Sequence, residues 1–294
     1  MFYLIVGIFC NLALLLLLKS FQKFNVASFP AIVINYFVAG GISLLFTNPK
    51  TVYLEATHLW LPSLALGALF VSIFYLISLT IETNGISVTT VANKMSVVIP
   101  VILAFIIYKD SPHLLKILGI ILALLSVFLV SSASPPTPLQ EERGAKVSRG
   151  RAVLPIAVFI GSGVIDAIVN YTQKKLVHSE VETACFIGLT FFAAGLIGVV
   201  AFMLFYKDKA RLNMKRTLLA GIILGLPNYF SIYFIMKAIN ANFIESSVLY
   251  PLLNVSVVLG STLGAYVFFS EKLSLKNRMG IALSVLAITL IALA

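Results

Sequence analysis

Residues 242–294 read NFIESSVLYPLLNVSVVLGSTLGAYVFFSEKLSLKNRMGIALSVLAITLIALA and contain two long apolar runs, 243–269 and 279–293. Each run is about as long as the ~20 residues that a helix needs to cross the hydrocarbon core of a bilayer. The first run is polar in its first half, and small residues then follow at four-residue spacing from Ser256 to Gly264. Polar groups at membrane depth face protein or a water-filled path, and small residues at this spacing let another helix approach closely. The stretch predicts two membrane helices joined by a short charged hairpin.

The same order of features occurs in residues 85–131. A helix with a polar first half runs into the charged hairpin YKDSPH, and an apolar helix with an early glycine follows. In this comparison Asp110 corresponds to Glu271, and Gly119 corresponds to Gly280. An internal repeat of this kind determines the architecture, and it predicts a chain built from two related halves.

The composition indicates an integral membrane protein. The chain has 294 residues, of which 60% are hydrophobic and 11% are charged, and its mean hydropathy is +1.04. A water-soluble domain of this composition would expose far more apolar surface than such domains tolerate. The net charge of +10 comes from lysines and arginines in the loops between apolar runs, which is typical of topology control. We therefore expect a lipid bilayer as partner and no nucleic acid.

Ten apolar windows are long enough to be membrane helices. They fall near residues 2–18, 29–46, 59–81, 86–108, 113–131, 153–172, 183–206, 216–237, 243–269 and 275–293. The first window lacks a basic start and a small-residue cleavage site, so we expect a membrane helix there. The prediction is an all-α integral membrane fold of ten transmembrane helices.

A Pro-rich, charged stretch, residues 132–151, reads as the linker between the halves. It separates a first five-helix repeat, residues 1–131, from a second one, residues 152–294. An odd number of helices in each half places the two halves in opposite orientations. This inverted repeat is common among secondary transporters, which bind substrate near the bilayer midplane between the repeats.

With these features the chain resembles the drug/metabolite transporter superfamily, and within it the EamA-type ten-helix permeases. The resemblance covers essentially the whole chain. It is carried best by the apolar helix followed by Ser-Glu-Lys-Leu-Ser at 270–274 and a final helix with Gly280 near its start. The first half has Lys-Asp-Ser-Pro at 109–112, where Asp110 replaces the family's usual glutamate. The resemblance implies a permease, and amino acids and their relatives as the best-known cargo.

Basic residues are divided unequally between the two expected sides of the membrane. The side of the odd-numbered loops has fourteen and the other side six. The fourteen are Lys19, Lys23, Arg143, Lys146, Arg149, Arg151, Lys207, Lys209, Arg211, Lys215, Arg216, Lys272, Lys276 and Arg278. Positive-inside reasoning places the odd loops in the cytoplasm and both termini outside, whereas the resemblance favours cytoplasmic termini. The expected location is the cell membrane, plasma or inner, as a multi-pass protein.

Three charged residues lie within or at the edge of expected helices: Lys94, Asp166 and Glu245. One interpretation is a transport site in which Lys94 pairs with an acidic substrate group or with Asp166, and an acid carries a coupling proton. The alternative is a structural pair that neutralises Lys94, with Glu245 capping its own helix. The cap is the favoured interpretation for Glu245, and the site is favoured for the other two.

Uncharged polar residues of the expected helices complete the candidate substrate site. They are Asn35, Tyr36, Tyr75, Asn93, Asn170, Asn228, Tyr229, Tyr250 and Asn254. A single asparagine in a membrane helix is more commonly hydrogen-bonded to a neighbouring helix than placed in a site. The concentration of these residues in a few helices is what favours a shared central cavity.

The sequence contains no P-loop, dinucleotide fingerprint, zinc-protease motif or nucleophile elbow. We therefore expect that the protein binds no cofactor or metal and is not an enzyme. We expect transport to be driven by an ion or substrate gradient. The expected function is secondary transport, as export, of a small polar metabolite by alternating access around a midplane site. A multidrug exporter of lipophilic cations is the alternative within transport. A lipid-handling protein or membrane enzyme is the alternative from another class, and the three histidines, in three different loops, do not favour it.

Overall fold

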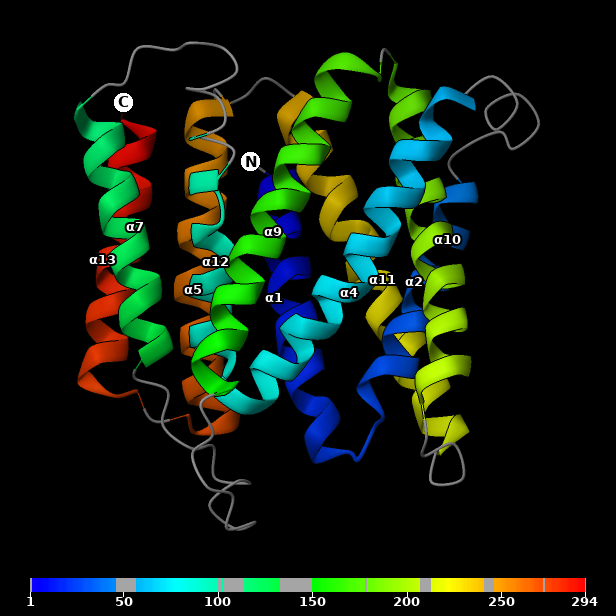
Figure 1. The fold of residues 1–294 in the computed structure, drawn as a ribbon, viewed down its shortest axis with the longest axis horizontal. Helices are drawn as coiled ribbons and strands as arrows, with labels where there is room; N and C mark the ends of the chain where they lie inside the picture. The colour runs from blue at the N-terminus through cyan, green and yellow to red at the C-terminus, as the bar shows by residue number, and fades with distance from the viewer. Residues whose placement is uncertain are drawn as a thin grey trace.

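The computed structural model describes residues 2–45, 57–99, 102, 114–132, 150–177, 179–206, 213–240, 246–271 and 273–293. Regular structure in these ranges is entirely helical (Figure 1). The elements are α1 (Phe2–Lys23), α2 (Ser28–Leu45), the 3-10 turn η1 (Thr57–Leu59), α4 (Trp60–Asn84), α5 (Ile86–Met95), α7 (Leu114–Ser132), α9 (Gly150–Lys175), α10 (Glu180–Phe205), α11 (Met214–Asn240), α12 (Ser246–Phe269) and α13 (Leu275–Ala292). Of the expected linker, only the helical ends of α7 and α9 are in these ranges.

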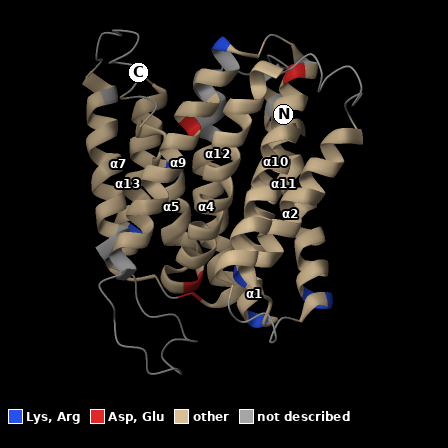
Figure 2. Ribbon diagram, turned by 45° about the vertical axis from the view of Figure 1, so that its right-hand side comes forward, with Lys and Arg blue, Asp and Glu red and all other residues tan. Residues whose placement is uncertain are grey.

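Six of the described helices are long and apolar enough to cross a membrane. Their spans are Phe2–Lys23, Ser28–Leu45, Thr57–Asn84, Val181–Phe205, Met214–Ile235 and Leu275–Ala292. Large apolar side chains such as Leu61 and Leu204 lie exposed on the outside of the bundle, where water would not tolerate them in this number. Most of the described charges lie toward the two ends of the bundle (Figure 2). The chain is a membrane-embedded helical protein.

Helices from the two parts of the sequence pack against each other throughout the bundle. Three helices of the first part pack on helices of the second part. The α2 helix packs on α10 and α11, α4 packs on α9 and α10, and α1 packs on α11 and α12. In addition, α7 packs on α13, and α5 lies against α9 and α12. The N- and C-termini lie at the same end of the bundle (Figure 1). Contacts between the two parts of the chain therefore hold the fold together.

The glycines at four-residue spacing in α12 bring that helix close to α1. A Cβ added to Gly260 would lie 2.8 Å from Leu12, and one added to Gly264 would lie 2.9 Å from Leu16. Both distances are too short for a real Cβ contact. The spacing therefore serves packing within one chain, which is the close helix approach that small residues permit.

The helix expected over residues 86–108 is not continuous. The α5 helix ends at Met95, Ser96 and Val97 form a turn, and residues 98–99 are helical again. The backbone N–H of Ile99 donates to the Ser96 carbonyl at 2.9 Å. In a regular helix the N–H of residue 100 would donate to the Ser96 carbonyl. Residue 100 is a proline and has no N–H, which explains why the regular helix stops here. Of the rest of the expected helix, only residue 102 lies within the described residues.

The first helix is longer than expected. The apolar window ends near residue 18, and the following residues 19–23, KSFQK, form the last turns of α1, which ends at Lys23. Two side chains of this last turn find acceptors at the end of α4. Lys19 donates to the carbonyl of Ile81 at 3.2 Å, and Gln22 donates to that of Glu82 at 3.3 Å. These contacts keep the charged turn helical and bury Lys19.

Candidate functional site

Two hydrogen bonds join α5 to α9 beside the break that ends α5. The Ser96 hydroxyl donates to Oδ2 of Asp166 at 3.0 Å, and Nδ2 of Asn93 donates to the Ser162 hydroxyl at 2.8 Å. The Ser96 hydroxyl is also 2.6 Å from the Asn93 carbonyl, which ties the turn to the last turn of α5. Asp166 lies mid-helix in α9, so a carboxylate is held at the point where α5 loses its regular backbone.

Lys94 lies in the last turn of α5, next to this polar junction. Its side chain is half-buried and interacts electrostatically with Asp166. Among the described residues, however, Lys94 has no direct ion pair. A cation is favoured at the carboxyl end of a helix, where the backbone carbonyls are unpaired. The ammonium and the carboxylate are therefore close enough to influence each other without being locked together.

Apolar side chains surround the polar junction. Val91 and Met95 of α5 are fully buried, and Val158 and Phe159 of α9 pack in the same core cluster. Charged groups in such surroundings are costly and are characteristic of functional positions in membrane proteins. Lys94, Asn93, Ser96, Ser162 and Asp166 form the candidate site, which we call the α5–α9 site. Ser96 and Ser162 are not among the candidate residues of the sequence analysis, because a serine in an apolar run gives no distinctive signal.

A second polar group lies between α2 and α11. Nδ2 of Asn228 donates to Oδ1 of Asn35 at 3.1 Å, and both residues are buried. Next to Asn35, the Tyr36 hydroxyl donates to the Phe70 carbonyl at 2.8 Å. Among the described residues, no hydrogen bond or ion pair joins Asn35, Tyr36 or Asn228 to the α5–α9 site. The asparagines meet each other across a helix interface instead.

The other candidate residues lie apart from the α5–α9 site or outside the described side chains. Tyr229 is buried and stacks on Tyr233 in α11, and Tyr75 packs edge-on against Phe29. Asn254 is buried in α12 and has no hydrogen bond to a described residue. Asn170 and Tyr250 are helical, but their side chains lie outside the description, as does all of Glu245.

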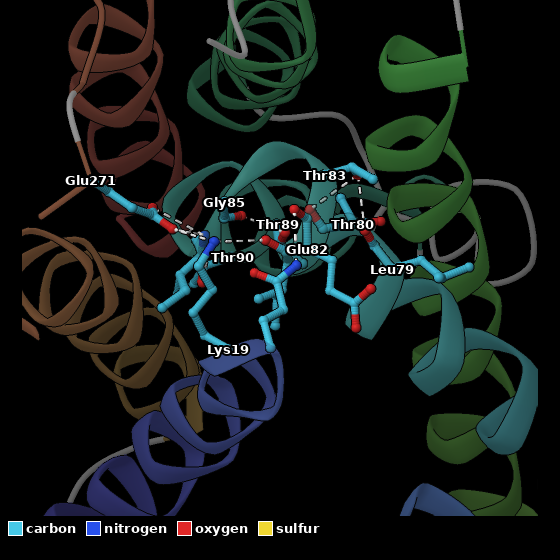
Figure 3. Close-up of polar contacts among 12 residues, drawn as sticks. Lys19, Leu79, Thr80, Glu82, Thr83, Gly85, Thr89, Thr90 and Glu271 are labelled. Atoms are coloured by element: carbon cyan, nitrogen blue, oxygen red, sulfur yellow. Dashed lines mark hydrogen bonds and ion pairs between the residues drawn. The ribbon is translucent and has the colours of Figure 1, made fainter. Parts of the chain in front are cut away.

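The sequence analysis missed a buried ion pair at the opposite end of α5. Nζ of Lys19 lies 3.1 Å from Oε1 of Glu271, with side chains only 7% and 11% exposed. Both carboxylate oxygens of Glu271 also accept from the backbone N–H of Ile86, each at 3.2 Å. Figure 3 shows Lys19 and Glu271 meeting beside Gly85, between the end of α4 and the start of α5.

From the sequence alone, both residues of this pair look like loop charges. Lys19 was counted among the basic residues that set topology, and Glu271 was placed in a charged hairpin. One signal pointed to the pair. The α5 helix begins after Gly85, which has no side chain to cap it, so its first N–H groups require an acceptor from elsewhere. Glu271 supplies that acceptor from a distant part of the sequence.

The comparisons with known proteins bear on the family and the fold. No family model matches the chain. A protein of Haemophilus influenzae, described as uncharacterized, is 30% identical over 292 residues, which are 97% of this chain and 95% of that protein. The chain belongs to the family of this Haemophilus protein. The match extends over nearly all of both sequences. A solved crystal structure is also similar, with a TM-score of 0.59 and 15% identity over 97% of this chain and 95% of that one. At this identity the likeness shows a common fold alone.

Proposed function

We propose that the chain is a secondary transporter that exports a small polar metabolite, with amino acids and related zwitterions as the expected cargo. The observation that carries the proposal is the α5–α9 site. A helix stops at Ser96, and a carboxylate from another helix, Asp166, accepts a hydrogen bond from that residue. Interrupted helices with polar groups at the break are how many secondary transporters bind substrate inside the membrane.

The proposed architecture is ten transmembrane helices in two inverted repeats, as in the EamA-type drug/metabolite transporters. The helix packing supports it. If the halves are exchanged, α1, α2, α4, α5 and α7 correspond to α9, α10, α11, α12 and α13. Under this exchange the contact of α2 with α11 becomes that of α10 with α4, and the contact of α5 with α9 becomes that of α12 with α1. All four contacts are present in the structure, as expected for a two-fold relationship in the membrane plane.

The chemistry of the site favours a zwitterion over a lipophilic cation. Lys94 offers an ammonium to a substrate carboxylate, and Asp166 offers a carboxylate to a substrate amine. In the multidrug alternative we would expect a deep acid without a nearby base. Lys94 interacts with Asp166 electrostatically, so the site offers a basic and an acidic group together. The proposed transport is alternating access of the two halves around this site, driven by a substrate gradient or a coupling proton.

The distribution of basic residues supports cytoplasmic odd-numbered loops. Lys19 is buried in an ion pair and leaves the count, so thirteen of the fourteen basic residues remain on that side against six on the other. The imbalance still places both termini outside the cytoplasm by the positive-inside rule. We propose a multi-pass protein of the plasma or inner membrane in this orientation.

Ligand-dependent thermal stabilisation of the purified protein tests the proposed cargo. A ligand that binds only the folded state stabilises it by about 2.7 kcal/mol at 100 times its Kd. We expect amino acids to raise the melting temperature of the wild type and of Lys237→Ala, a matched lysine at the end of α11. The same ligands should not shift Lys94→Ala. A shift with lipophilic cations alone would contradict the proposed cargo. The absence of a shift with every polar metabolite in the screen would contradict it as well.

A further inference from the structure

The ion pair of Lys19 and Glu271 lies at a junction of four chain segments. Lys19 comes from α1, and Glu271 comes from the turn between α12 and α13. The acceptor of a second Lys19 hydrogen bond is the Ile81 carbonyl, in the last turn of α4. The donor to Glu271 is the Ile86 N–H, the first residue of α5. We call these four groups the α4–α5 latch.

Each charge of the latch is matched to a helix end as well as to its partner. The carboxyl end of α4 carries the negative end of the helix dipole, and Lys19 lies against it. The amino end of α5 carries the positive end, and Glu271 lies against that. Hydrogen bonds to ionised groups are stronger than neutral ones. The latch is therefore held by the ion pair, the two helix dipoles and charge-assisted hydrogen bonds together.

Gly85 is the residue that makes room for the latch. Its φ is +92°, a conformation that side chains disfavour. A Cβ built on it would lie 2.8 Å from Oε2 of Glu271. On the other side, Ser270 also has a positive φ of 51°, and the Glu271 N–H donates to the Ala265 carbonyl at 3.1 Å. The backbone on both sides is turned so that the carboxylate reaches the start of α5.

We propose that the α4–α5 latch is the gate that holds this end of the transporter closed. The inference rests on the proposed transport function. In alternating access the two halves must part at one end, and Glu271 of the second half holds the junction of α4 and α5 in the first. Opening this end requires Glu271 to leave both Lys19 and the Ile86 N–H. The nearly complete burial of both side chains corresponds to the closed state.

A cysteine introduced next to the latch allows opening of the latch to be measured in the absence of substrate. Ser87 is 2% exposed and follows Ile86 directly, and its hydroxyl has no hydrogen-bond partner among the described residues. Ser87→Cys is therefore a nearly isosteric probe. It is introduced after Cys10 and Cys185 are replaced by alanine. The measured quantity is the rate of alkylation by a small water-soluble maleimide in detergent-solubilised protein.

We expect Glu271→Gln to raise this rate about tenfold or more, because loss of one partner leaves the buried lysine charge uncompensated. Lys19→Met removes the other charge and should act in the same direction. The matched control is Glu82→Gln, a carboxylate near the same helix end that accepts from Ser28 at 2.7 Å. The control should stay within about twofold of the parent, because Glu82 makes no ion pair with Lys19 among the described residues.

Unchanged rates in both variants, or an equal rise in the control, would overturn the gate. Failure of both variants to yield monodisperse protein would also overturn it, since a gate opens in the working protein and is not required for folding. A raised rate in a protein that binds no metabolite would support the gate and count against the proposed cargo. The two proposals are thus separately testable.

Discussion

Ser96 and Asp166 meet where α5 stops, with the serine hydroxyl 3.0 Å from the aspartate Oδ2. The two residues are 70 positions apart in the chain, and their contact joins the end of α5 to α9. It places an acid, an amide and a lysine around an interrupted backbone in otherwise apolar surroundings.

We predict that Lys94→Ala and Asp166→Asn each abolish transport without loss of the protein from the membrane. Each variant removes one of the two charges proposed to hold a zwitterion. Ser96→Ala should lower the transport rate by about tenfold to a hundredfold, because a hydrogen bond to a charged group contributes roughly 1.5–3 kcal/mol. Uptake into vesicles and membrane abundance are measured side by side. Better transport in the Lys94→Ala/Asp166→Asn double variant than in either single one would indicate a structural pair.

The Asn35–Asn228 contact should affect stability and leave transport intact. The two amides hydrogen-bond each other between α2 and α11. Such a contact between membrane helices contributes about 0.6 kcal/mol on average and up to about 1.7 kcal/mol. Asn228→Ala should lower the free energy of unfolding by that amount, measured in detergent denaturation. Unaltered stability together with loss of the substrate-induced thermal shift would indicate that these asparagines belong to the substrate site.

Two glycines provide a test of the helix packing. A Cβ on Gly67 would lie 2.7 Å from Ala193 Cβ and 2.8 Å from the Ala194 backbone nitrogen, whereas Gly41 has no atom within 4 Å of its Cβ position. Gly67→Ala should destabilise the protein by about 1–3 kcal/mol, because α4 and α10 must move apart. Gly41→Ala should be neutral or slightly stabilising through its higher helix propensity. Equal melting temperatures for the two variants would argue against the close contact of α4 with α10.

The membrane orientation is tested by a reporter at the C-terminus. Both termini lie at the same end of the bundle, and the odd-numbered loops, which we expect on the opposite side of the membrane, contain most of the basic residues of the sequence. We expect a C-terminal alkaline phosphatase fusion, which is active only outside the cytoplasm, to be active, and a fluorescent protein fusion that requires the cytoplasm to be dark. The reverse pattern would agree with the orientation that the EamA resemblance favours, and would show that charge counting fails for this chain.

Much of the fold was predictable because length and hydropathy determine where a membrane helix can be. The windows near 29–46 and 275–293 agree with α2 and α13 to within one residue at each end. The window over 86–108 missed the turn at Ser96 and Val97, because apolar composition does not reveal a backbone interruption. Pro100 in the same stretch was the available signal.

The candidate site was predictable in its charges and less so in its polar neighbours. Lys94 and Asp166 are conspicuous as charges within apolar runs, and the structure brings them near each other. Asn35 and Asn228 are also polar residues within apolar runs, but they hydrogen-bond each other between α2 and α11. Lys19 and Glu271 were missed because a charge at a helix end looks like a loop charge until the chain folds around it. Side-chain direction relative to other helices is a tertiary property that hydropathy does not encode.

The most direct test of the proposed function is transport by the purified protein in liposomes. Vesicles are preloaded with an amino acid that stabilises the protein, and uptake of the same labelled compound by exchange is followed over time. We predict exchange by the wild type and by Lys237→Ala, and none above empty vesicles by Lys94→Ala or Asp166→Asn. Equal exchange by all four proteins would contradict the site, and an absence of exchange by the wild type for a ligand that binds it would contradict transport itself.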